Sequence, residues 1–129
     1  MDKNVVTIES TGMTSQAIEK MIQAKVWSLV VERQGLPVGV VTDRDIIRRC
    51  AATGRYPDRV KVEEVMSSPI LTITPEATAG EAMRMLVDKG VRRLYVVEEG
   101  KIIGRVTQTG LFRNMLDLMM SLASLSHQL

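Results

Sequence analysis

Apolar residues recur in the same order in the two halves of this chain. The first half aligns with the second at a constant offset of 65 residues without a gap, which is the pattern of an internal repeat. Many shared positions are glycines or apolar residues, the types that fix turns and cores. The identical pairs are Met1 and Met66, Thr7 and Thr72, Ile8 and Ile73, Ala17 and Ala82, Val26 and Val91, Leu29 and Leu94, Val31 and Val96, Gly35 and Gly100, Gly39 and Gly104, Val41 and Val106, and Thr42 and Thr107.

Within each copy, the spacing of apolar residues predicts the order strand, helix, strand, turn, strand, helix. The first helix of each copy presents one apolar face, because its apolar residues recur three and four apart. Two β-rich runs then predict a hairpin, with its turn around Gly35 and Pro37 in the first copy and Glu99 and Gly100 in the second. The predicted strands are residues 5–8, 28–31 and 38–42, and residues 70–73, 94–97 and 102–107.

The sequence also places several helix ends. Thr78 followed by Glu81 has the form of a capping box and predicts the start of a helix, whereas the first copy lacks this box. The helix after Thr42 is predicted to end near Gly54, since glycine adopts the left-handed conformation of a helix end. Residues 55–61 then form a linker. We therefore divide the chain into residues 1–60, with the linker, and residues 61–129.

Each copy of about 60 residues is too small to bury a comfortable core alone. We expect an α/β (α+β) fold in which two small three-stranded sheets, each with two helices, pack through their sheets as one pseudo-twofold unit. Residues 111–125 continue as a helix rich in methionine and leucine, with Arg113, Asn114 and Asp117 on one side. Core or homodimer packing is one interpretation of this helix, and capture of a regulated enzyme is the other.

Composition narrows the functional classes. Hydrophobic residues make up 45% of the 129 residues and charged residues 25%, which is typical of a globular protein. The net charge of +2 and the 3% of aromatic residues do not favour nucleic-acid binding. No segment resembles a signal peptide or a membrane span, and the single cysteine fits a reducing compartment, so we expect a cytoplasmic protein.

Enzymatic activity is not expected. The only histidine, His127, lies near the end of the chain, and Cys50 has no evident base beside it in the sequence. No spacing of residues indicates a metal site or paired catalytic acids. We therefore expect no catalytic cofactor and no metal.

The chain resembles the cystathionine-β-synthase (CBS) domain pair, also called a Bateman module, over essentially its whole length. The segment from Gly39 to Asp45 is similar to the family's ribose and phosphate segment, in which an apolar strand ends in Thr/Ser-x-x-Asp. The run from Val91 to Leu94 and the Val65-Met66 pair are also typical of the family. The resemblance implies a regulatory module that binds an adenine nucleotide and reports it to another protein.

The chemistry of the first of these segments fits that role. Thr42 lies where a strand meets a helix, and free N–H groups at a helix start attract an anion, so Thr42 is expected to face a phosphate. The two carboxylate oxygens of Asp45 can accept both hydroxyls of a ribose, and Val40 offers an apolar wall to a purine. The competing interpretation of Thr42 and Asp45 is an ordinary capping box, and one acid can serve both purposes.

Basic residues provide candidate phosphate partners. Arg92 and Arg93 lie where family members place basic residues facing the cleft, and Arg44 is a further candidate. A guanidinium can hold two phosphate oxygens and stays charged at physiological pH. One of the adjacent pair Arg92 and Arg93 could instead point to solvent, because alternate strand residues face opposite ways.

The two copies differ at these positions. Gly110 stands in the place of Asp45 and Arg105 in the place of Val40, while Thr107 matches Thr42. We therefore expect one competent cleft per chain and a vestigial second one. The family resemblance also implies backbone contacts to the base from Lys3 to Val5 and from Val26 to Trp27. Core or dimer packing is the alternative for Trp27.

These observations lead to one preferred function and one alternative. The preferred function is a regulatory adenine-nucleotide sensor. AMP is favoured over ADP or ATP because few basic groups converge on the site, and the expected partners are a second copy of the chain and an unidentified regulated protein. The alternative is a protein-interaction or dimerisation scaffold with vestigial clefts. The resemblance also allows S-adenosyl compounds or nucleic acid as ligands, but nothing in the sequence selects them.

Overall fold

The two copies form two three-stranded sheets of the same topology, which confirms the predicted fold class. The computed structural model describes the backbone of residues 1–128 and the side chains of residues 1–123, so the His127 side chain lies outside the described part. In each sheet the first strand is parallel to the second, and the second is antiparallel to the third. The strands are β1 (Thr7–Glu9), β2 (Ser28–Arg33), β3 (Leu36–Thr42), β4 (Thr72–Ile73), β5 (Arg93–Glu98) and β6 (Lys101–Thr107).

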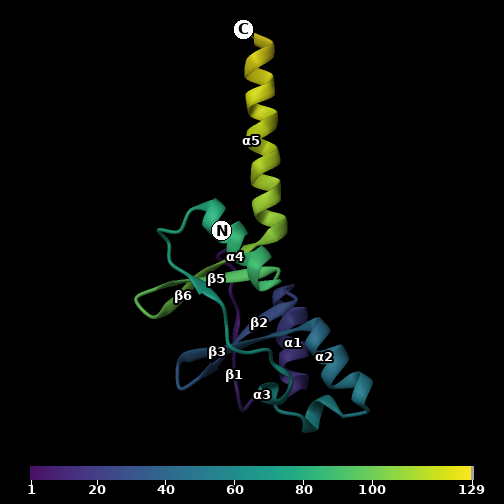
Figure 1. The fold of residues 1–129 in the computed structure, drawn as a ribbon. Helices are drawn as coiled ribbons and strands as arrows, with labels where there is room; N and C mark the ends of the chain where they lie inside the picture. The colour runs from purple at the N-terminus through teal and green to yellow at the C-terminus, as the bar shows by residue number, and fades with distance from the viewer. Residues whose placement is uncertain (129) are drawn as a thin grey trace.

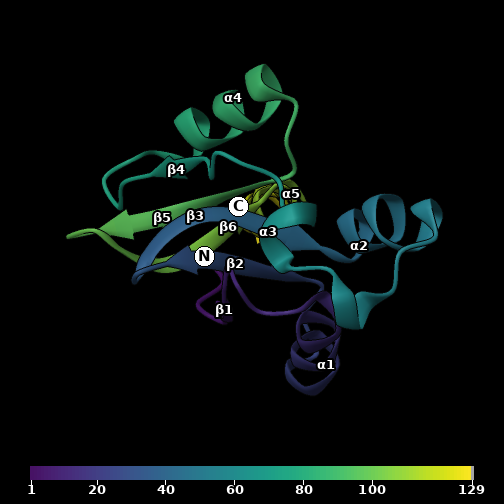
Figure 2. The same ribbon diagram turned by 90° about the horizontal axis from the view of Figure 1, so that it is seen from below.

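The sheets lie face to face in the interior, with α1 and α4 on opposite outer sides (Figure 2). The long helix α5 leaves this body and projects away from it (Figure 1). The helices are α1 (Thr14–Ala24), α2 (Asp43–Arg49), α3 (Val62–Val65), α4 (Ala79–Lys89) and α5 (Gln108–Gln128), with two short 3₁₀ turns, η1 (Ala51–Thr53) and η2 (Pro57–Arg59).

The hairpin turns correct one detail of the prediction. Gln34 and Gly35 both have positive φ, as do Glu99 and Gly100, so each hairpin closes with two left-handed residues. Pro37 was assigned to the turn but lies in β3, opposite Glu32 at a register shift. A proline fits there because β3 is at the edge of its sheet and the ladder is already interrupted.

Two isolated backbone bridges join the copies. Val40 in β3 pairs with Ser67 ahead of β4, and the equivalent residue Arg105 in β6 pairs with Asp2 ahead of β1. The backbones approach so closely that a Cβ on Gly39 would lie 2.7 Å from the Ser67 carbonyl oxygen. Asp2 and Ser67, ahead of β1 and β4, are therefore engaged with the other copy, and both strands begin two residues later than predicted.

The end of the linker and the helix α3 that follows it pack with the first copy. Val60, Val62 and Val65 are buried in the cluster that also contains Leu29 and Val41. Thr14 at the start of α1 donates its hydroxyl proton to the Val60 carbonyl oxygen, at 2.8 Å. In the described part of the second copy, the fully buried cluster is smaller and consists of Ala82, Leu86 and Leu94. The two copies therefore share a topology but differ in the extent of their cores.

Candidate functional site

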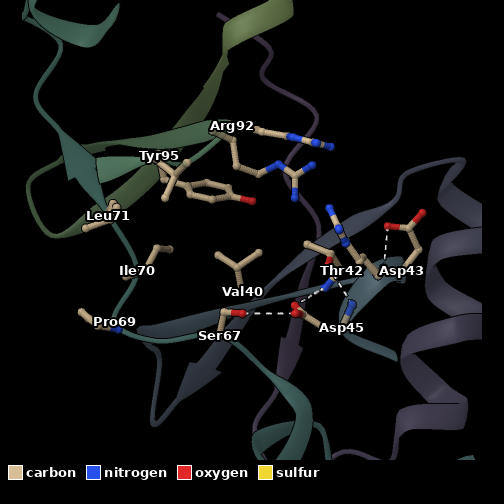
Figure 3. A pocket seen from close by; sticks show the side chains of 14 residues that line it. Val40, Thr42, Asp43, Asp45, Ser67, Pro69, Ile70, Leu71, Arg92 and Tyr95 are labelled. Atoms are coloured by element: carbon tan, nitrogen blue, oxygen red, sulfur yellow. Dashed lines mark hydrogen bonds between the residues drawn. The ribbon is translucent and has the colours of Figure 1, made fainter. Parts of the chain in front are cut away.

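A cleft of about 370 Å³ lies between the two copies. One wall comes from the end of β3 and the start of α2, and the other comes from the segment ahead of β4 and the start of β5 (Figure 3). The lining residues are Val40, Thr42, Asp43, Arg44, Asp45, Ser67, Pro69, Ile70, Leu71, Gly90, Val91, Arg92, Arg93 and Tyr95. Six of the residues singled out from the sequence, namely Val40, Thr42, Arg44, Asp45, Arg92 and Arg93, therefore meet in one place.

Thr42 and Asp45 form a capping box at the start of α2. The Asp45 amide donates to Thr42 Oγ1 at 3.1 Å, and the Thr42 amide donates to Asp45 Oδ2 at 3.0 Å. Ser67 from the segment ahead of β4 donates its hydroxyl proton to Asp45 Oδ1 at 3.2 Å (Figure 3). Because a carboxylate can accept about four hydrogen bonds, Asp45 is held in a fixed orientation with acceptor capacity left over.

The start of α2 does not offer the free N–H groups that the sequence analysis assumed. The Asp43 amide donates to the Trp27 carbonyl oxygen, and the Arg44 amide donates to the Asp43 carboxylate. The Asp45 amide is taken by Thr42, as described above, and the helix is only seven residues long. The premise that free N–H groups at the start of α2 would attract a phosphate was therefore wrong. The Thr42 hydroxyl still has its own proton to donate.

The positive charge of the cleft comes from side chains. Arg44, Arg92 and Arg93 all line it, and none of them forms an ion pair among the described residues. Asp43 and Asp45 supply the only carboxylates in the lining, so three guanidinium groups face two acids. An anionic ligand would be attracted to this end, where Arg92 reaches from the opposite wall toward Thr42 (Figure 3).

The other end of the cleft is apolar. Val40 lies below it, Pro69, Ile70 and Leu71 close one side, and the ring of Tyr95 lies above (Figure 3). The sequence analysis did not select the last four residues. The repeat offset would have found two of them, because Pro69 and Ile70 are the second-copy equivalents of Asn4 and Val5 within the predicted Lys3 to Val5 contact segment.

The remaining predicted contact residues lie outside this cleft. Lys3 and Val5 line a separate hollow beside the hairpin turns, and Val26 is buried in the first core. Trp27 is 63% exposed, so within one chain it is not a core residue. The segment ahead of a first strand and the start of a second strand do line the cleft, as the family resemblance implies. These elements are the residues ahead of β4 and the start of β5, which belong to the second copy, because the Val40–Ser67 bridge holds that copy against this site.

The equivalent second cleft is crossed by Arg105. Its guanidinium donates to the Ser28 hydroxyl at 2.8 Å and pairs with the Asp2 carboxylate. Ser28 stands in the place of Arg93 and Asp2 in the place of Ser67, so the arginine spans the positions that line the first cleft. Gly110 in the place of Asp45 removes the equivalent acid, Arg105 takes up the Asp2 carboxylate, and the arginine puts a cation in the space of Val40.

Acidification should loosen this contact. A hydrogen bond from the Asn4 amide, and then the Arg105 side chain, lower the pKa of Asp2. Because the native pKa lies below the unfolded one, Asp2 stabilises the fold fully above about pH 4 and its contribution is lost as the pH falls through the native pKa. We expect the melting temperature of the wild type to lie slightly above that of Asp2→Asn at pH 6. The two melting temperatures should converge as the pH falls toward about 2.

Thermal melts across that pH range measure the effect, which is small because the Asp2 side chain is 46% exposed. The control is Asp58→Asn, since Asp58 forms no ion pair among the described residues. A constant gap between wild type and Asp2→Asn at every pH would contradict the contribution of this pair.

The geometry defines a class of protein, a two-repeat α+β module with an open cleft between the β3–α2 junction of one repeat and the β4–β5 side of the other. The CBS domain family matches residues 1–52 and 62–117, so the chain belongs to this family. Among the described residues there is no group of side chains suited to a metal ion. No helix in the described part is both long and apolar enough to cross a membrane.

Relatives share this architecture. The CBS domain-containing protein YhcV of Bacillus subtilis is 30% identical over 99% of this chain and 93% of its own length. An uncharacterized protein of Methanopyrus kandleri is 35% identical over 81% of this chain, which spans only 55% of that protein. A hexameric CBS-domain protein from bloom-forming cyanobacteria has a TM-score of 0.77 at 29% identity, over 87% of this chain and 66% of that one. None of these names indicates an enzymatic activity.

Proposed function

We propose that the protein is a non-catalytic regulatory module of the cytoplasm that binds an adenine nucleotide in the open cleft. The observation that carries this proposal is the convergence of a fixed acid, Asp45, and unpaired guanidinium groups at one end of an apolar cleft. This pattern matches the three parts of a nucleotide. Arginines suit the phosphate, the acid suits the sugar hydroxyls, and the apolar end suits a purine.

The cleft chemistry favours a monophosphate. Arg44, Arg92 and Arg93 are opposed by Asp43 and Asp45, so the excess positive charge around the anion is small. AMP would be bound more tightly than ADP or ATP, because each further phosphate adds negative charge without a further partner in the cleft. A nucleotide that bridges the two walls would change their relative packing. Nucleotide binding and partner binding would then be coupled by a free energy of about 1 to 3 kcal/mol.

Calorimetric titration with AMP, ADP and ATP tests the proposal. We expect roughly micromolar to millimolar dissociation constants, tightest for AMP, and one nucleotide per chain because Arg105 crosses the second cleft. Two nucleotides per chain would contradict the account of the second cleft. No heat and no rise in melting temperature at millimolar nucleotide would overturn the sensor itself.

A specific observation also supports self-association. Helix α5 exposes most of its large apolar side chains, with Leu118 at 61% and Met119 at 59%, while Arg113, Asn114 and Asp117 stay on one side. Together with α4 it also borders an apolar groove of about 640 Å³. The residues that line this groove include Met83, Val87, Leu111, Met115 and Leu118.

We infer that a second copy of the chain covers this surface. Leu111, Met115, Leu118 and Leu122 follow one another at spacings of four, three and four, which is the seam of a coiled coil. A single helix extending from the body buries too little apolar surface to be stable in water. Every copy offers the same seam and groove, so two copies can cover each other, and they would enlarge the small core of the second repeat.

A further inference from the structure

The Tyr95 hydroxyl is buried in the open cleft and forms no hydrogen bond within the part of the chain that the structure describes. The side chain belongs to β5, is only 2% exposed and lines the open cleft. Its hydroxyl has no hydrogen-bond partner among the described residues. A buried hydroxyl without a partner destabilises a fold, because the group has lost its hydrogen bonds to water, so such groups are rare in the absence of a function.

The hydroxyl points toward the middle of the cleft. In Figure 3 the Tyr95 ring starts on the apolar side, near Leu71, and its oxygen is directed above Val40 toward the end that carries Thr42. The atom therefore lies between the apolar lining and the charged lining. A nucleotide with its base at the apolar end and its phosphate at the arginines would place its sugar–phosphate junction near this hydroxyl.

The repeat offset shows that the hydroxyl is peculiar to the open cleft. The residue equivalent to Tyr95 is Val30, which faces Val40 across its sheet, as Tyr95 faces Arg105. A valine suffices for packing between the sheets, since Val30 is 1% exposed. Packing alone therefore does not account for the phenol oxygen of Tyr95.

We propose that the Tyr95 hydroxyl is a ligand-recognition group that donates a hydrogen bond to an oxygen at the sugar–phosphate junction of the bound nucleotide. The assignment rests on the proposed nucleotide function and adds to it a specific donor. This role accounts for the unsatisfied hydroxyl, because the bound nucleotide supplies the acceptor that the described residues lack. It also predicts opposite effects of removing this one atom on ligand binding and on the stability of the protein alone.

The variant Tyr95→Phe tests the assignment, because it keeps the ring and removes only the oxygen. We expect its dissociation constant for AMP to rise about tenfold, the usual effect of losing a hydrogen bond to a charged or polar partner. Without nucleotide, its melting temperature should equal or exceed that of the wild type, because an unpartnered buried hydroxyl is gone. Calorimetry and thermal melts with and without AMP provide both measurements.

The matched control is Tyr56→Phe, since Tyr56 is 67% exposed and lies outside the cleft. It should bind AMP as the wild type does. Equal AMP affinity of wild type and Tyr95→Phe would overturn the role of the hydroxyl and leave the nucleotide function standing. A marked fall in melting temperature of unliganded Tyr95→Phe would also overturn it, because the oxygen would then have a partner within the protein. A wild type that binds no nucleotide would overturn both proposals.

Discussion

Asp45→Ala should abolish measurable AMP binding, with the dissociation constant raised about a hundredfold or more. The carboxylate is fixed by the Thr42 amide and the Ser67 hydroxyl and is the only acid in the cleft held in this way. Its removal takes away both acceptors for the sugar hydroxyls, and each hydrogen bond to a charged group contributes about 1.5 to 3 kcal/mol. Calorimetric titration of AMP into the purified variant measures the loss.

The same substitution also removes a helix cap, so stability must be separated from binding. Capping substitutions destabilise a protein by about 0.5 to 2 kcal/mol. Glu81→Ala is the matched control, because Glu81 accepts a hydrogen bond from Thr78 in the capping pair at the start of α4, away from the cleft. This control should show a comparable fall in melting temperature and unchanged AMP affinity. If Asp45→Ala binds AMP as well as Glu81→Ala does, the acid serves only as a helix cap. That result would favour the alternative function, a protein-interaction or dimerisation scaffold.

Leu118→Glu should convert the protein from a dimer to a monomer. The side chain lies on the proposed seam of α5 and borders the groove with α4, so the substitution would bury a carboxylate without a partner in the interface. The expected penalty of several kcal/mol would dissociate the dimer at micromolar concentration. Light scattering coupled to size-exclusion chromatography should give a mass near the 14.3 kDa of one chain.

Met120→Glu adds the same charge at an exposed position on the side of α5 opposite the seam and should leave the dimer intact. Two results would contradict the inferred interface. One is a wild type that is monomeric at high micromolar concentration, and the other is a Leu118→Glu variant that retains the mass of the wild type. The first result would instead favour α5 as a surface for another protein.

The repeat allowed most of the fold to be predicted. A gapless offset places all six strands and the helices α1 and α4 in matching positions, and each copy supports the assignment of the other, as with the paired hairpins that close at Gly35 and Gly100. The positions of Val40, Thr42 and Asp45 in one cleft also followed from the strand-to-helix junction. These features depend on residues close together in the sequence.

What could not be predicted depends on contacts between the copies. Lys3, Val5 and Val26 were assigned to the first cleft, whereas Ile70, from the second copy, lies there. The deciding contact is the Val40–Ser67 bridge, a backbone pairing between residues far apart in the sequence. The local spacing of apolar residues does not predict such a pairing. Tyr95 escaped notice for a similar reason. In the sequence it is one more residue of a β-rich run, and only the packed structure shows that its hydroxyl is buried without a partner.

The attachment of the linker and α3 to the first core bears on how the chain assembles during synthesis. Val60, Val62 and Val65 complete the apolar cluster of the first copy, so that all of its buried residues are synthesised before β5. Domains generally fold from the N-terminal side as they emerge. We therefore expect the first repeat to act as a preformed template, and the later repeat, with its smaller core, to become ordered by docking against it.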